Sequence, residues 1–188
     1  MATITVRNGV DVDQLVQTID AIGQDANIGR FTFKARTDWT GGGTSTAGIS
    51  AFTHAGQESG HATTHTLTGS EPAVLLGEDA GANAVELILA ALGFCYSVGF
   101  AYNAAARGIE LEELAYELEG DIDLRTFVGL GGGPRAGFTE IRVKGIAKAK
   151  NADAATLEEL CQYVQDTSPV RDIIANATPV VTDLKVLA

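Results

Sequence analysis

The chain has 188 residues, a mass of 19.5 kDa and a formal net charge of -11, with 13 lysines and arginines against 24 aspartates and glutamates. This length suits one domain with a buried core, and 45% hydrophobic residues with a mean hydropathy of +0.11 exclude a disordered chain. Because the net charge repels phosphate backbones and anionic lipid, we expect neither nucleic acid nor a membrane as a partner.

Residues 1–70 are expected to hold one helix followed by antiparallel strands. Apolar side chains recur at helical spacing over residues 11–24, behind an aspartate that suits a helix cap. Residues 30–39 alternate aromatic and charged side chains, which is typical of a half-buried strand, and residues 44–53 and 60–67 are rich in threonine, serine and alanine. A turn signal between the last two segments predicts an antiparallel meander.

The central helix is predicted over residues 83–107, from a cap at Asn83 to a stop at Arg107, which a glycine follows. The twenty residues from Leu87 to Ala106 carry no formal charge, a length that would span a bilayer. Serine, asparagine, tyrosine and many small residues make this run only weakly apolar. A helix buried in a protein core or an oligomer is the simpler interpretation.

Residues 109–188 complete the predicted domain. A strand over residues 114–124 carries acidic side chains on one face and a strand over residues 141–150 carries basic ones, so antiparallel pairing would place opposite charges together. The remaining elements are helices over residues 154–167 and 169–175 and a closing strand over residues 179–187. This order of elements predicts an α+β fold in a single domain, residues 1–188.

Cys95 is the candidate nucleophile. With only one other cysteine, Cys161, the chain lacks a disulfide scaffold, and its first residues lack the pattern of a secretory signal, so a reducing cytoplasm is favoured. In the middle of an apolar helix, a thiol is either a small buried hydrophobe or a nucleophile. The nearest basic residue along the chain is Arg107, so a cation that activates Cys95 has to come from another segment or subunit.

Two further sets of ionisable residues are expected to have no catalytic or metal-binding role. Glu86 lies three residues after Asn83, the spacing of a capping box, and nine residues before Cys95, on the opposite face of an ideal helix. His61 and His65 are four residues apart, which in a strand spans about 13 Å, too far for one metal ion to bridge. We therefore expect no metal site and no other cofactor.

Four segments together resemble the OsmC/Ohr family of thiol-dependent organic hydroperoxide reductases. They are the helix run GANAVELILAALGFCYSVGFAYNAAARGIELEEL, the strand AYELEGDIDL, the segment GFTEIRVKG and the run TSPVRDIIANATPVV. The match extends from about Glu71 to Leu187. The resemblance implies an OsmC-like α+β fold in which two chains form an intertwined homodimer, with long central helices flanked by antiparallel sheets and a reactive site at the dimer interface.

The resemblance also implies a chemistry. The first family cysteine, matched by Cys95, attacks a peroxide as a thiolate and becomes a sulfenic acid, and a second cysteine in a Cys-Pro-Val motif then forms a disulfide with it. Here the matching tripeptide begins with Ser168, which places the chain in a subgroup with serine instead of the second cysteine. An oxidised Cys95 would be reduced by an external thiol, by Cys161 after rearrangement, or not at all.

Two more site residues are implied by the family. Its thiolate-stabilising arginine comes from an early strand, where Arg30 and Arg36 are candidates and Arg36 is preferred because it lies deeper in the strand. Its carboxylate falls one position before Glu86 when the chains are aligned on Cys95, and Val85 occupies that position here. Glu86 is kept as the candidate carboxylate.

The resulting prediction is a cytoplasmic homodimer that reduces organic hydroperoxides in an oxidative stress response, using Cys95 alone, an apolar pocket for the alkyl chain and an external thiol as reductant. Two alternatives remain open. The absence of a second cysteine at Ser168, together with Val85, suggests a non-enzymatic protein that binds a small apolar ligand. A stress protein in which Cys95 is inert core is the other.

Overall fold

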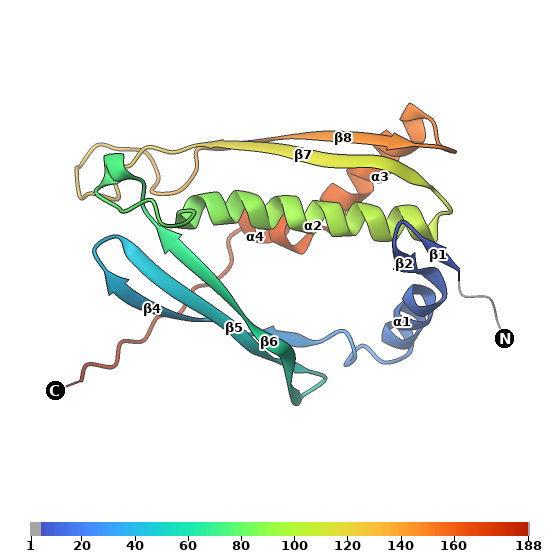
Figure 1. Ribbon diagram of the computed structural model, residues 1–188, viewed down its shortest axis with the longest axis horizontal. Helices are drawn as coiled ribbons and strands as arrows, with labels where there is room; N and C mark the ends of the chain where they lie inside the picture. The colour runs from blue at the N-terminus through green and yellow to red at the C-terminus, as the bar shows by residue number, and fades with distance from the viewer. Residues whose placement is uncertain (1–4, 188) are drawn as a thin grey trace.

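The computed structural model describes residues 5–187 and arranges them as a helical and sheet body with a separate strand layer (Figure 1). The chain begins with a hairpin of β1 (Val6–Arg7) and β2 (Val10–Asp11), followed by α1 (Val12–Gln24). Asp11 accepts a hydrogen bond from the backbone N–H of Gln14 at 2.9 Å, so the predicted helix and its cap are confirmed.

The second part is an antiparallel sheet of β3 (Phe31–Phe33), β4 (Arg36–Gly41), β5 (Thr44–His54) and β6 (Gln57–Ser70). β5 pairs with β3 and β4 along one edge and with β6 along the other, which confirms the meander. Ala55 and Gly56 connect β5 to β6 with φ angles of 48° and 78°, as a two-residue hairpin turn requires.

The predicted half-buried strand over residues 30–39 is wrong in two respects. It divides into β3 and β4 around Lys34 and Ala35, and its aromatic side chains are exposed, with Phe33 at 75% and Trp39 at 73%. The alternating pattern requires a surface that covers the apolar face, and residues 5–187 of one chain do not supply it. This strand layer therefore has an uncovered apolar face.

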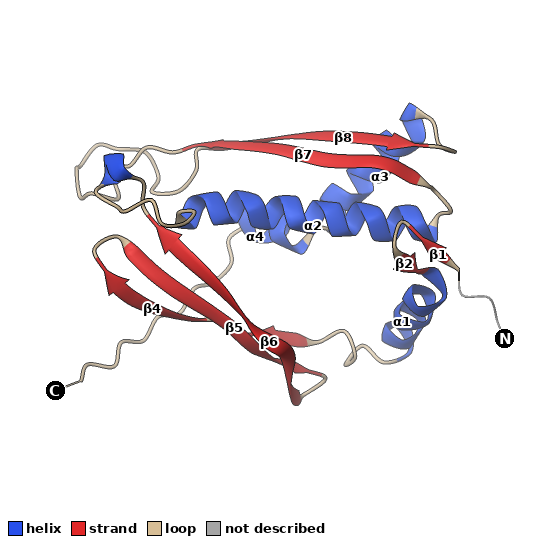
Figure 2. Cartoon of the chain, in the orientation of Figure 1, coloured by secondary structure: helices blue, strands red, loops and turns tan. Residues whose placement is uncertain are grey.

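The remaining elements form the body of the fold. They are η1 (Ala73–Leu75), α2 (Ala84–Ala106), β7 (Leu111–Asp121), β8 (Glu140–Ala149), α3 (Ala154–Thr167) and α4 (Pro169–Ala175). The β7–β8 hairpin lies along α2, while α3 and α4 pack against another side of the same helix (Figure 2). The core lies between these elements and consists of Leu92, Tyr96, Phe100, Ala104, Ile109, Leu160 and Val164. The predicted helices and the α+β class are confirmed.

The opposite charges on β7 and β8 meet as predicted. Glu117 stands across from Lys144 and Glu119 across from Arg142, and both pairs form ion pairs, at 2.9 Å and 2.6 Å. Such exposed cross-strand pairs contribute roughly 0.2–1 kcal/mol each, so they set the register more than the stability. β7 ends at Asp121, three residues earlier than the predicted strand over residues 114–124.

The predicted closing strand over residues 179–187 is wrong, because these residues have no regular secondary structure. The apolar side chains Val180, Val181 and Leu184 are 87%, 95% and 82% exposed. A strand needs a hydrogen-bonded neighbour, and no strand within the described chain pairs with this segment.

α2 is buried on one side only. Its polar side chains are satisfied locally, since Ser97 donates to the carbonyl of Gly93 at 2.9 Å and Asn103 to that of Gly99 at 2.8 Å. The other side exposes Ile88, Phe94, Val98 and Tyr102 by 46%, 73%, 51% and 46%. Full burial of this helix is therefore not achieved within one chain. By length and apolar composition alone α2 would also suffice to cross a membrane.

Candidate active site

The start of α2 fixes the position of Glu86. The Asn83 side chain accepts from the backbone N–H of Glu86 at 2.9 Å, and the Glu86 carboxylate accepts from the backbone N–H of Asn83 at 2.8 Å. These two bonds form the reciprocal capping box that the spacing predicts. Glu86 is thus engaged at the helix terminus, and the structure gives it no contact with Cys95.

Cys95 meets Ser168 across the core. The Cys95 Sγ lies 3.1 Å from the Ser168 Oγ, and only 6% of Ser168 is exposed. Ser168 ends α3 and caps α4, where its hydroxyl oxygen accepts from the backbone N–H of Arg171 at 3.2 Å and Pro169 occupies the first helical position. The helix break at this serine therefore holds its side chain against the thiol.

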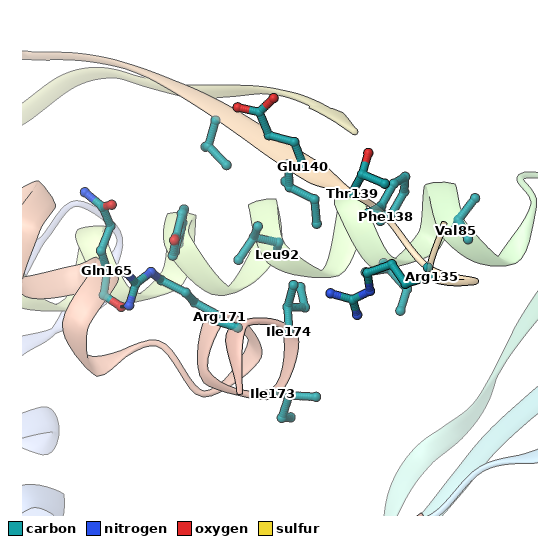
Figure 3. A pocket seen from close by; sticks show the side chains of 16 residues that line it. Val85, Leu92, Arg135, Phe138, Thr139, Glu140, Gln165, Arg171, Ile173 and Ile174 are labelled. Carbon is teal, nitrogen blue, oxygen red and sulfur yellow. Dashed lines mark hydrogen bonds between the residues drawn. The ribbon is translucent and has the colours of Figure 1, made fainter. Parts of the chain in front are cut away.

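A groove of about 580 Å³ lies between the first half of α2, the strand entry into β8, and α4. Its apolar wall includes Leu92 and Ile174, and the side chains of Arg135 and Arg171 extend along it (Figure 3). Within residues 5–187 neither arginine forms an ion pair. Tyr96, which follows Cys95 on α2, also lines the groove, whereas Cys95 itself does not.

The Tyr96 phenol lies in the field of both the arginine and the thiols. Burial raises the pKa of Tyr96, the positive charge of Arg171 acts in the opposite direction, and Cys161 and Cys95 each raise it further. Burial likewise raises the pKa of Tyr116, whose ring lies 5.6 Å from that of Tyr96. Both phenols therefore remain neutral hydrogen-bonding groups at physiological pH.

Arg171 was missed when the sequence alone was considered. Along the chain Arg107 is the basic residue nearest to Cys95, whereas Arg171 lies on α4, just after the α3–α4 junction, and lines the groove. A signal was present, because Arg171 lies three residues, about one helical turn, after Ser168, the residue that matches the family's second cysteine.

The predicted arginines lie elsewhere in the protomer. Arg36 is 81% exposed on β4, where it binds Asp38 through two hydrogen bonds, and this partner raises the pKa of Arg36 while lowering that of Asp38. Arg30 is exposed just before β3. Within the described chain neither contacts Cys95, since both belong to the strand layer that lies apart from α2 in Figure 1. Their assignment to the site stays a prediction.

The spacing argument for the histidines is wrong. The rings of His61 and His65 lie 4.8 Å apart. β6 bulges between Gly60, which pairs with Ala51, and His65, which pairs with Ile49, so four residues face one on β5 and the chain contracts. In the part of the chain that the structure describes, no group of three or more His, Cys, Asp or Glu residues is arranged to hold a metal ion.

Cys161 is a free, half-buried thiol on α3. Gln165 lies 3.6 Å from its sulfur, and the residue packs beside Tyr116 and Phe100 at the edge of the core. No disulfide joins it to Cys95. The two cysteines are therefore held in different packing environments on different helices.

Comparison with known proteins decides the family. The family model described as OsmC-like protein matches residues 77–183, which include Cys95, Ser168 and Arg171. The chain belongs to the OsmC-like protein family. Among curated proteins, none matches this OsmC-like chain.

Solved structures share the fold of this OsmC-like protein. An OsmC-like protein from Mycoplasma pneumoniae is 14% identical, with a TM-score of 0.56 over 77% of this chain and 87% of that one. An organic hydroperoxide resistance protein OsmC from Legionella pneumophila is 19% identical, with a TM-score of 0.51 over 76% and 88%. At these identities the similarity establishes a common α+β fold.

Proposed function

We propose that this OsmC-like protein is a thiol-dependent organic hydroperoxide reductase that works through Cys95 alone. The observation that carries the proposal is the contact of 3.1 Å between the Cys95 sulfur and the Ser168 hydroxyl, together with a partly apolar groove that the next residue, Tyr96, lines. An inert core cysteine is surrounded by apolar atoms, whereas this thiol has a hydroxyl as a polar partner, and Arg171 lines the groove that the neighbouring residue Tyr96 also lines. The family supports a role in peroxide stress.

The reaction balances with an external thiol. The Cys95 thiolate attacks the terminal oxygen of the hydroperoxide, the O–O bond breaks, and the leaving alkoxide takes a proton to become an alcohol, which leaves Cys95 as a sulfenic acid. One external thiol condenses with the sulfenic acid, forming a mixed disulfide and water. A second external thiol displaces Cys95, which returns as a thiol while the two reductant molecules leave as a disulfide.

The external reductant follows from the two free cysteines. Serine at position 168 offers no sulfur for a disulfide, and Cys161 is held on α3 beside Tyr116, without a bond to Cys95. A sulfenic acid formed at Cys95 is therefore reduced by a thiol from solution. Such chemistry suits a cytoplasm in which small thiols are abundant.

The groove supplies a place for the alkyl group. Leu92 and Ile174 provide apolar surface, and Arg171, whose guanidinium donates to the carbonyl of Gln165 at 3.5 Å, lines the same groove. Because Leu92 and Cys95 are three residues apart on α2, they are neighbours on the helix surface. A hydroperoxide whose carbon chain lies on Leu92 therefore directs its oxygen atoms toward the thiol side of the helix.

A homodimer is part of the proposal. Within residues 5–187, the apolar face of α2 and the strand layer β3–β6 are both uncovered, and the segment after Thr178 has no partner strand. A second copy that covers these surfaces buries the apolar side chains that the sequence pattern expects to be buried. It would also bring Arg36 or Arg30 of one subunit toward Cys95 of the other.

Trapping of the oxidised cysteine tests this function. Wild type, C95S and the matched variant C161S are treated with one equivalent of an organic hydroperoxide in the presence of dimedone, and intact masses are measured over minutes. We expect one adduct in wild type and C161S and none in C95S. Absence of any adduct in wild type, or an adduct that persists in C95S, contradicts the proposal.

The groove also favours a second candidate function. Its volume of about 580 Å³ and its mixture of apolar wall and arginines suit a small amphipathic ligand without any redox step. In that case native mass spectrometry finds a ligand that C95S binds as well as wild type does, and hydroperoxide leaves Cys95 unmodified. Loss of bound ligand from a groove variant such as I174R, with unchanged peroxide reactivity, separates the two functions.

A further inference from the structure

Two hydrogen-bond contacts of Ser168 constrain the direction in which its hydroxyl proton points. A serine hydroxyl has one proton to donate and two lone pairs to accept. One lone pair accepts the backbone N–H of Arg171 at 3.2 Å, and the side chain is almost fully buried. Among the described residues, the Cys95 sulfur at 3.1 Å is the one acceptor within hydrogen-bond distance of this hydroxyl, so we assign the proton to the contact with the sulfur.

We infer that Ser168 is a positioning residue for Cys95, whose hydroxyl donates a hydrogen bond to the sulfur and favours the thiolate. This inference rests on the proposed function for its biological meaning, although the hydrogen bond is independent of it. A hydrogen bond to the charged form of an acid stabilises that form, and bonds to charged groups are stronger than neutral ones. Ser168 thus takes over a chemical task at the position where the family motif has its second cysteine.

The rest of the junction keeps this hydroxyl in place. Pro169 fixes the backbone that follows Ser168, and the bond from Arg171 N–H holds the oxygen while leaving its proton free to face Cys95. Because oxygen forms no disulfide, the same group that favours the thiolate also leaves the oxidised sulfur open to an external thiol. One residue therefore accounts both for thiol activation and for the one-cysteine course of the reaction.

The test measures thiolate formation at Cys95 without any peroxide. In a C161S background, the rate of iodoacetamide alkylation is followed from pH 5 to 10 for the protein with Ser168 and for the variants S168A, S168G and S168T. We expect the pH midpoint of alkylation to rise in S168A and S168G, and the rate at pH 7 to fall about tenfold, as loss of one hydrogen bond to a charged group implies. S168T retains a hydroxyl and should restore most of the rate.

Matched variants separate this role from helix capping. D153A removes the cap of α3, which accepts from Thr156 N at 2.9 Å, and should leave the alkylation profile of Cys95 unchanged. S168G loses less capping energy than S168A and should shift the profile equally. Equal midpoints and rates in S168A, S168G and wild type overturn the inference, as does a shift of the same size in D153A.

The substitution S168C provides a geometric check. Sulfur at this position should form a disulfide with Cys95 when one equivalent of hydroperoxide is added, in place of the dimedone adduct. In the C161S background, a folded S168C protein that keeps both of its thiols free after treatment with a disulfide oxidant shows that residue 168 does not face Cys95. If the alkylation midpoint rises in S168A and S168G as expected but wild type does not react with peroxide, the inference stands and only the proposed function is rejected.

Discussion

Replacing Glu86 by alanine and by glutamine distinguishes a capping role from a catalytic one. E86A removes the carboxylate that accepts from Asn83 N at 2.8 Å, whereas E86Q retains an amide oxygen at that place. Loss of one such capping bond costs about 1 kcal/mol, which for a domain of this size lowers the melting temperature by about 3 °C. E86Q should lose less than half of that amount.

Thermal unfolding and single-turnover oxidation of Cys95 are measured on the same preparations. Because Glu86 lies nine residues before Cys95 on α2 and points to the opposite side, both variants should keep the oxidation rate of wild type within about twofold. N83A, which removes the other half of the capping box, serves as the matched control and should lose stability without losing rate. An E86Q protein with wild-type stability but a tenfold slower oxidation refutes this reasoning and restores Glu86 as the catalytic carboxylate.

Three further predictions concern the rest of the fold. F100A should lower the free energy of unfolding by about 3–5 kcal/mol in urea titrations, since Phe100 is 2% exposed. Arg142 lowers the pKa of Asp121, so the stability from this pair is present above the ordinary pKa of 3.8 and is lost as the pH falls through the lower folded value; R142A should flatten that acid dependence in melting curves. F94E, on the exposed face of α2, should weaken the proposed homodimer in sedimentation experiments and leave the helix content unchanged; a monomeric wild type would contradict this prediction.

Local features of the fold were predictable because their causes lie within a few residues. The caps at Asp11, Asn83 and Asp153 and the proline after Ser168 locate four helices from side-chain chemistry alone. The charges of β7 and β8 likewise predict that acids of one strand lie opposite bases of the other, since alternation assigns each side chain to a face.

The sequence predictions that were wrong or incomplete concern features that depend on residues far apart in the chain. The bulge in β6 that brings His61 to His65 depends on pairing with β5, and spacing along one strand does not reveal it. The segment over residues 179–187 has the composition of a strand, but strand formation depends on a partner that one chain lacks. Arg171 is placed in the groove by the helix break at Ser168. Its distance along the chain from Cys95 therefore gave no indication that it lines the groove.

The most direct test of the central claim is multiple turnover with an organic hydroperoxide and a monothiol, with the alcohol product quantified over time for wild type, C161S and C95S. The account predicts that wild type and C161S form many equivalents of alcohol per chain at similar rates, and that C95S forms none above the thiol alone. A C95S protein that produces alcohol as fast as wild type contradicts the account.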